Sequence, residues 1–249
     1  DPNSEKDIET LNELIRRADF IFESSPSKTL SSYGIDFNTA KRLNERIVYV
    51  RISPFGDDGP HANFLGNDLV VASMGGPVAL QGEPEREPIK LSVPQVWRHA
   101  GVEAASGAMA AHARMLKTGE GLFVDVSAQC VMTWTMLNAM DAHAIQGFDF
   151  QRLGAQVNNG MVITDIMHPT TDGYIVAVPL SGVILGCMDW MIEDGVIDES
   201  YRDIDWEAYD VNAPFPGEGP MELAEGTAML RRFFAQHEKM ELFEFGLRN

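Results

Sequence analysis

The first half of the chain alternates stretches of helical periodicity with short apolar runs of strand length. Residues 7–18 place four apolar side chains on one helical face, and the apolar run at 19–23 follows directly. A second short helix is expected from Asp36, the predicted N-cap, before the strand-like run at 46–53. Helices that alternate with strands in this way predict a parallel α/β layer.

The stretch from residue 94 to 117 is rich in alanine, glycine and serine and predicts one long helix. Small side chains let another helix or a sheet approach such a helix closely, and Gly119 is in the position of its C-terminal cap. A strand is expected at 122–126, and a helix at 128–146. Ser127 lies at the junction and is the predicted N-cap of that last helix.

The pattern changes near residue 150, where the chain becomes rich in turn formers. A strand is expected at 174–180 and helices at 183–194 and 223–236, with an acidic, aromatic and turn-rich segment between these helices. The chain of 249 residues is long enough for one large domain or two modest ones.

The fold class that we predict is therefore α/β. We expect an open parallel-sheet large domain over residues 1–150, Rossmann-like and incomplete, and a smaller α+β domain over 151–249. Neither end resembles a finished terminus, so we expect the chain to be part of a longer polypeptide.

Charge and cysteine content exclude several classes of function. The net charge of −18 disfavours binding to nucleic acid and to anionic membranes. No apolar stretch reaches the ~18 residues of a membrane helix. The two cysteines do not form a disulfide framework, which favours a reducing compartment, and we expect a cytoplasmic protein.

The titratable residues leave one candidate for chemistry. The six histidines lack the spacing of a metal site, so no metal is expected. Cys130 would lie in the first turn of the helix after Ser127, where exposed N–H groups and the helix dipole favour an anion. A small buried hydrophobe at the strand–helix junction would give the same pattern.

Several segments, in the same order, resemble the class III CoA-transferases, which are also called the CaiB/BaiF or formyl-CoA transferase family. "KTGEGLFVDVSAQ" is similar to the family's R-x-x-T-G-x-G-Q-x-V-D-V-S segment. Further similar stretches are "ADFIFESSPSKTLSSYGI", "NERIVYVRISPFGDDGPHANFLGNDLVVASMGG", "HAGVEAASGAMAAHARMLKTGEG" and "TTDGYIVAVPL". Together they cover most of residues 5–190.

The resemblance implies acyl-CoA and carboxylic acid substrates, no permanently bound cofactor, and two chains interlocked as a dimer. It also implies a mechanism. An aspartate just after the V-D-V-S strand attacks an acyl-CoA thioester and forms a mixed anhydride. The released CoA attacks the enzyme's own carbonyl, and an acceptor acid then displaces the resulting enzyme–CoA thioester.

Cys130 occupies the position of that aspartate here. A thiolate can accept an acyl group, but it has no carbonyl carbon to which CoA could attach, so it cannot transfer CoA between free acids. The family's E-N-F-R-P-G segment is replaced by Glu23 to Lys28, which removes the asparagine and arginine positions, and no clear glycine-rich loop is found between Gly154 and Gly160. Asn67 replaces the histidine of the family's racemases.

Four readings remain open. The chain is a non-catalytic subunit or half of a CoA-transferase, paired as a homo- or heterodimer with a family paralogue. Alternatively, it is a Cys130-dependent acyl-CoA thioesterase or acyltransferase, a transferase using another carboxylate (Asp125, Glu103 or Asp68), or a CoA-binding assembly module without chemistry. The candidate groups for binding CoA are Ser24, Arg51, Arg98, Arg114 and Lys117.

Overall fold

The computed structural model describes residues 4–24, 29–158, 162–213 and 215–248. The chain divides into two compact units. The first comprises residues 1–81 and 88–141, and the second comprises residues 82–87 and 142–249. The domain boundary near residue 150 stays a prediction.

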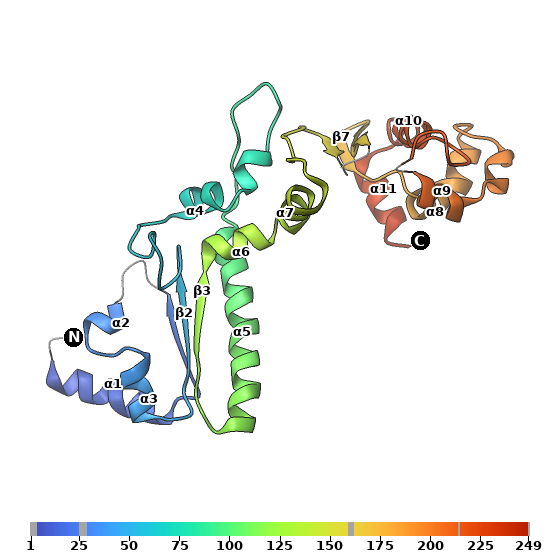
Figure 1. The fold of residues 1–249 in the computed structure, drawn as a ribbon. Helices are drawn as coiled ribbons and strands as arrows, with labels where there is room; N and C mark the ends of the chain where they lie inside the picture. The colour runs from blue at the N-terminus through green and yellow to red at the C-terminus, as the bar shows by residue number, and fades with distance from the viewer. Residues whose placement is uncertain (1–3, 25–28, 159–161, 214, 249) are drawn as a thin grey trace. The chain divides into compact units, whose positions relative to one another are not determined.

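The first unit contains a parallel sheet of three strands, β1 (Phe20–Ser24), β2 (Val48–Ser53) and β3 (Phe123–Ser127), in the order β1-β2-β3 (Figure 1). The register aligns Glu23 with Arg51 and Arg51 with Asp125 across the three strands. The parallel α/β layer predicted from the alternating pattern is therefore confirmed.

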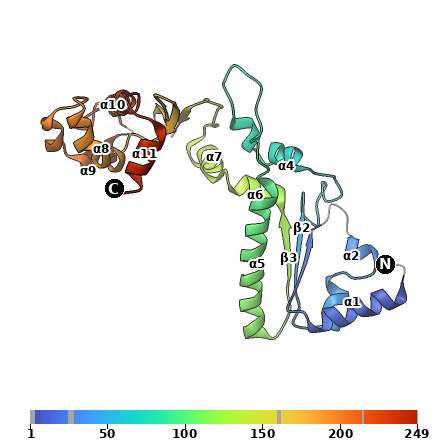
Figure 2. The same cartoon turned by 180° about the vertical axis from the view of Figure 1, so that it is seen from behind.

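Helices cover both faces of this sheet, because successive side chains of a strand point to opposite sides. The alanines of α5 (Val96–Thr118) pack with Val48 and Val50 on one face. On the other face, Ile47 and Tyr49 pack with α1 (Glu5–Arg17) and α3 (Phe37–Leu43), and Figure 2 shows α5 and α1 on different sides of the strands. The short helix α2 (Thr29–Ser32) lies between β1 and α3 in sequence.

Local capping follows the sequence closely in this unit. The Asp36 side chain accepts a hydrogen bond from the Thr39 N–H at 2.7 Å and begins α3. Gly119 ends α5 in the left-handed region at φ +78°, a conformation that glycine adopts without a Cβ penalty. Two further short elements are α4 (Asp68–Met74) and the 3₁₀ turn η1 (Pro77–Leu80).

The single helix predicted over residues 128–146 is wrong. The structure has α6 (Ala128–Trp134), α7 (Leu137–Asp141) and a π-helical turn, η2 (Ala142–Gln146). Two threonines, Thr133 and Thr135, flank the end of α6 at Trp134, and Thr135 Oγ1 donates to the Met132 carbonyl at 2.6 Å. Such side-chain bonds compete with the helical ladder, which explains why α6 ends here.

The second unit combines two small antiparallel sheets with helices, as expected for an α+β fold. Strands β4 (Gln156–Asn158) and β5 (Ile163–Asp165) pair, as do β6 (Met167–Thr170) and β7 (Gly173–Val176). The helices are α8 (Ser181–Glu193), the 3₁₀ turn η3 (Glu199–Asp203), α9 (Trp206–Asn212), α10 (Leu223–Phe234) and α11 (Lys239–Gly246).

The core of the second unit confirms two predicted helices and adds one that the sequence did not indicate. Helices α8 and α10 match the predictions at 183–194 and 223–236 and bury Ile184, Met191 and Phe233. The acidic segment between them contains α9, whose Trp206 and Tyr209 are buried in the same core. Within the described ranges, no helix is long and apolar enough to cross a membrane.

Candidate functional site at the carboxyl edge of the sheet

The three parallel strands end side by side, and each ends in a serine: Ser24, Ser53 and Ser127. Ser53 and Ser127 are register partners. In open α/β sheets, ligands bind outside the carboxyl ends of the strands, so this edge is the candidate site of the first unit.

The loop after β2 folds back onto the end of β3. Ser53 Oγ accepts a hydrogen bond from the Gly56 N–H at 2.9 Å, and Asp125 Oδ2 accepts one from the Asp57 N–H at 2.8 Å. Gly56 has φ +92°, and a Cβ there would lie 3.4 Å from Asp125 Oδ2 and 3.5 Å from Ser127 Cβ. These are ordinary contact distances, so it is the left-handed φ that requires glycine at this turn.

Cys130 lies at this edge, in the first turn of α6. The Ser127 side chain caps the helix, since its Oγ accepts a hydrogen bond from the Cys130 N–H at 3.4 Å. The Gln129 N–H donates to the Pro54 carbonyl at 3.0 Å, which ties the start of α6 to the loop after β2. Cys130 is a free, exposed cysteine, so the reading as a small buried hydrophobe is wrong.

Nearby carboxylates have structural partners. Glu23 is buried and accepts hydrogen bonds from the Tyr49 hydroxyl at 2.9 Å and from the Leu30 N–H at 3.0 Å. Burial raises the pKa of the Asp125 carboxyl; the bond from the Asp57 N–H opposes that rise, and the charge of the Asp57 carboxylate adds to it.

Asp68 binds the start of α5. Its Oδ1 accepts hydrogen bonds from the Gln95 and Val96 N–H groups, both at 3.0 Å, and its Oδ2 lies 2.9 Å from Lys90 Nζ. These contacts satisfy N–H groups that a helix start leaves without partners. Glu103 is exposed on α5 and lines the same hollow beside α6 as Arg98, Val131 and Trp134.

The structure does not bring the five proposed CoA-binding groups together. Arg51 is buried in β2 and forms an ion pair with Asp57. This contact within the fold accounts for the arginine without a bound CoA. Arg114 and Lys117 are exposed near the C-terminal end of α5, and this end leads into the start of β3, at the amino edge of the sheet. Ser24 is exposed at the carboxyl edge.

Arg98 lies at the end of α5 that packs against α6. It lines a hollow of about 450 Å³ together with Gln95, His99, Val131 and Trp134. Trp134 is 64% exposed, so a large aromatic face is open at this hollow. Trp134 could not be identified as a site residue from the sequence, because nothing in the sequence shows that α6 ends there and packs on the first turns of α5.

The segment that replaces the family's asparagine and arginine positions begins with Glu23 and Ser24, and its remaining residues, Ser25 to Lys28, lie outside the described residues, as does Gly160. No group of three or more His, Cys, Asp or Glu side chains in the described part of the chain is arranged to hold a metal ion.

Comparisons with known proteins agree on one family. A family model described as CoA-transferase family III matches residues 1–185. A succinate–glutarate CoA-transferase from Agrobacterium fabrum is 31% identical over 163 residues, which cover 66% of this chain and 40% of that protein. The succinyl-CoA:(R)-benzylsuccinate CoA-transferase subunit BbsE from Thauera aromatica is 27% identical over 245 residues, which cover 96% of this chain and 57% of that protein.

A solved structure gives the same result for the fold. The crystal structure of a CaiB/BaiF family protein from Brucella suis matches with a TM-score of 0.70 and 25% sequence identity. The match covers 100% of this chain and 63% of that one. The chain thus spans well under two thirds of the length of the curated relatives named here.

Proposed function

The chain belongs to CoA-transferase family III, and from this premise we propose that it takes part in moving CoA between carboxylic acids as a copy without its own catalytic carboxylate. Its substrates are then an acyl-CoA thioester and an acceptor acid. The carboxylate that forms the acyl anhydride and the enzyme–CoA thioester comes from a family paralogue paired with this chain.

The observation that carries this proposal is the position of Cys130. Its thiol is exposed in the first turn after β3, where the resembled enzymes have their aspartate. In the family reaction, the carboxylate oxygen attacks the thioester carbonyl and CoA leaves as a thiolate. CoA must then attack a carbonyl carbon of the protein, and a cysteine side chain contains none.

Three carboxylates of the first unit do not provide a substitute. Asp125 accepts a hydrogen bond from the Asp57 N–H, and Asp68 accepts two from the start of α5. Glu23 is buried with two hydrogen-bond donors. A nucleophilic carboxylate has to reach the substrate carbonyl, whereas these three hold the loop, the helix and the strand in place.

The relative that covers 96% of this chain supports a paired arrangement, since its name describes a subunit of a CoA-transferase. For contacts to CoA phosphates, Arg98 is the strongest of the five candidates. It is exposed beside α6, at the same end of α5 as Cys130, whereas Arg51 is already paired and Arg114 and Lys117 lie at the far end of the helix.

Co-expression tests the proposal. The chain is produced together with a family III paralogue that carries aspartate at the position of Cys130, and complex formation and CoA transfer are measured. We expect a stable heteromer whose activity is lost when that aspartate becomes asparagine and is retained in the Cys130→Ala variant.

The opposite result separates the alternatives. Transfer of CoA between free acids by this chain alone, abolished by Cys130→Ala, would overturn the proposal. Hydrolysis of acyl-CoA that depends on Cys130, with an acyl adduct on that residue in mass spectra, would instead identify a thioesterase.

A further inference from the structure

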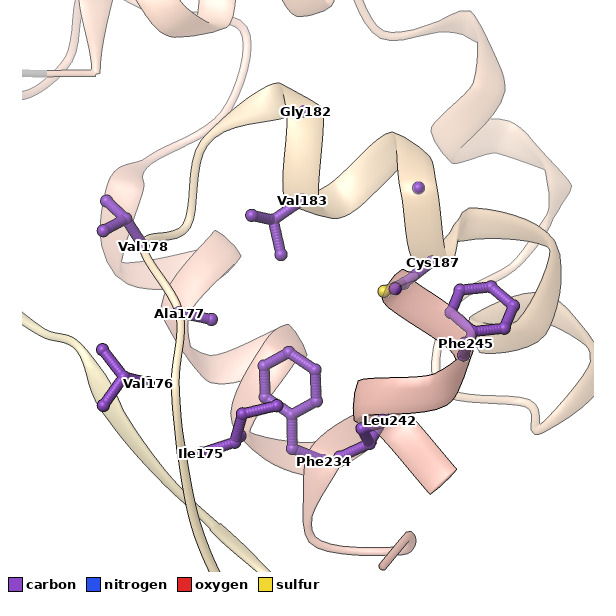
Figure 3. A pocket seen from close by; sticks show the side chains of 12 residues that line it. Ile175, Val176, Ala177, Val178, Gly182, Val183, Cys187, Phe234, Leu242 and Phe245 are labelled. Atoms are coloured by element: carbon purple, nitrogen blue, oxygen red, sulfur yellow. The ribbon is translucent and has the colours of Figure 1, made fainter. Parts of the chain in front are cut away.

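The second unit contains an apolar cavity of about 520 Å³ bordered by β7, α8, α10 and α11. The cavity is open to solvent, since the lining residues Val176 and Val178 are 64% and 43% exposed. Twelve residues line it, and none of them carries a charged side chain. The Cys187 thiol is the one polar side-chain group among these lining residues. Figure 3 shows Val183, Cys187 and Phe234 directed toward the same space from α8 and α10.

Glycines create part of this space. Gly182 and Gly186 lie one helical turn apart on α8, and Gly246 lies at the end of α11. A Cβ built on any of the three meets no atom within 4 Å, and none of the three has a positive φ. Glycine inside a helix costs roughly 0.5–1 kcal/mol relative to alanine, so neither backbone conformation nor crowding explains these residues.

The cavity walls are held by contacts that do not depend on a ligand. Phe234 and Leu242 are buried in the core of the unit. The Lys239 N–H at the start of α11 donates to Asp172 Oδ1 at 2.9 Å, beside the turn before β7. His237 Nε2 lies 2.7 Å from Asp194 Oδ2, which joins the segment before α11 to the end of α8. The cavity is therefore formed in advance, as is usual for small-molecule sites.

The chemistry of the lining selects an uncharged ligand. Burial raises the pKa of the Cys187 thiol, so the sulfur is neutral at physiological pH. His168 lies behind two lining residues: its Nε2 is 3.1 Å from the Ala177 carbonyl, and its ring packs on Phe234. Burial lowers the pKa of this histidine, and hence it adds no positive charge. The net charge of −18 further disfavours an anion.

We propose that this cavity binds an uncharged, largely aliphatic small molecule. Its volume lies within the range of about 300–1,000 Å³ that is common for such sites. The site belongs to the second unit and uses none of the residues of the carboxyl edge, so it goes beyond the proposed CoA chemistry and stands independently of it.

Alkylation of the two cysteines tests the proposal on the intact chain. N-ethylmaleimide is added at mildly alkaline pH with and without 1-octanol, and the labelled peptides are quantified by mass spectrometry. We expect the labelling rate of Cys187 to fall roughly tenfold at an octanol concentration about ten times its Kd. Cys130 is the internal control and keeps its rate. Octanoate, which carries a charge, protects Cys187 less than octanol does.

A pair of glycine variants provides a second measurement. The neutral fluorophore N-phenyl-1-naphthylamine should gain fluorescence with the wild type and lose it when octanol displaces it. We expect Gly186→Leu to fill the cavity and abolish the fluorescence gain. Gly101→Leu is the control and should retain it, because Gly101 is also helical with open space at its Cβ position but lies outside the cavity.

Three results would overturn the proposal. One is a Cys187 rate that octanol leaves unchanged, and another is equal protection of Cys130 and Cys187. The third is a Cys187 that reacts only after dilution, because a second copy of the chain then covers the cavity. The labelling experiment uses the wild type and decides the matter even if Gly186→Leu does not fold.

Discussion

Glycines beside the parallel sheet of the first unit and glycines on α8 of the second unit have opposite surroundings. In the first unit, a Cβ on Gly121 would lie 2.1 Å from the Ile47 carbonyl oxygen, and one on Gly107 would lie 2.9 Å from Val124 Cγ1. In the second unit, a Cβ on Gly182 or Gly186 would meet nothing within 4 Å. Glycine thus allows close packing around the parallel sheet, whereas on α8 it leaves a cavity empty.

The two cysteines follow the same division. Cys130 is exposed among polar groups at the sheet edge, whereas Cys187 is half-buried in an apolar wall. The difference indicates that the sheet edge of the first unit can present backbone N–H groups and polar side chains to a ligand, and that the side chains lining the cavity of the second unit offer mainly apolar contact. Four pairs of variants, one of each pair in each unit, test this comparison.

The largest difference is expected between Gly121→Ala and Gly186→Ala. The first forces the backbone just before β3 away from Ile47 and should cost roughly 3 kcal/mol or more of unfolding free energy. The second should stabilise α8 by roughly 0.5–1 kcal/mol, because alanine is the better helix former. Urea unfolding measures both values. Similar effects of the two substitutions would show that the units do not differ in packing.

Two buried tyrosines give the next pair. Tyr49→Phe removes the donor to Glu23 Oε2, and Tyr209→Phe removes the donor to the Pro179 carbonyl, at 2.9 and 2.6 Å. We expect costs of about 2–3 and 1–2 kcal/mol, respectively, because the first leaves a buried carboxylate oxygen without its partner. Hydrogen exchange of peptides from each unit shows where stability is lost. The loss should be confined to the unit that carries the substitution.

The same tyrosines predict an alkaline limit of stability. Burial is the main cause of the raised pKa of both, and it raises that of Tyr209 to about 12. An unfolded tyrosine ionises near pH 10, so the folded state binds more protons between pH 10 and 12. The stability that the two neutral tyrosines contribute is therefore complete below pH 10 and is lost as the pH rises above 10. Each Tyr→Phe variant should lose less unfolding free energy above pH 10 than the wild type does. A wild-type stability that is constant up to pH 12 would contradict this prediction.

Two helices depend on a distant aspartate for their first turn, one in each unit. Asp68 accepts from the Gln95 and Val96 N–H groups of α5, and Asp210 accepts from the Ser181 N–H of α8 at 2.8 Å. Replacing either aspartate with alanine should cost about 1–2 kcal/mol. Asp189→Ala, on the exposed surface of α8, is the control and should leave the urea midpoint unchanged.

The smallest effects are opposite slopes of stability with pH. Burial raises the pKa of Asp125 above its ordinary 3.8, so stability decreases as the pH rises above 3.8 toward the folded-state value. Burial lowers the pKa of His168 below its ordinary 6.5, so stability decreases as the pH falls below 6.5. Asp125→Asn and His168→Gln should each make the stability of the unit that carries the substitution depend less on pH. Urea midpoints measured from pH 4 to 8 test this.

Local signals in the sequence predicted much of the first unit. Asp36, Gly119 and Ser127 cap their helices as expected, because a cap is formed by a residue and its near neighbours. The strand before Cys130 and the place of this cysteine in the first helical turn followed from the same local rules. Family membership followed from several similar segments in one order.

Contacts between distant segments could not be predicted in this way. The sequence gives no sign that the Asp57 N–H donates to Asp125, 68 positions away, or that the buried Arg51 side chain pairs with the partly exposed Asp57. Nor does it show that the acidic segment after α8 forms α9, since Trp206 and Tyr209 become helical where they can be buried against α8 and α10.

The amino-acid sequence by itself determined the parallel α/β layer, the family and the presence of a thiol where a carboxylate is expected. Those features depend on periodicity, local capping and residue identity. Only the tertiary structure decided that Cys130 is exposed, that Glu23, Asp68 and Asp125 are engaged in hydrogen bonds and that α8 and α11 leave an apolar cavity. The reason is physical: solvent exposure, hydrogen-bond partners and empty volume depend on which distant segments pack together, and no local pattern encodes them.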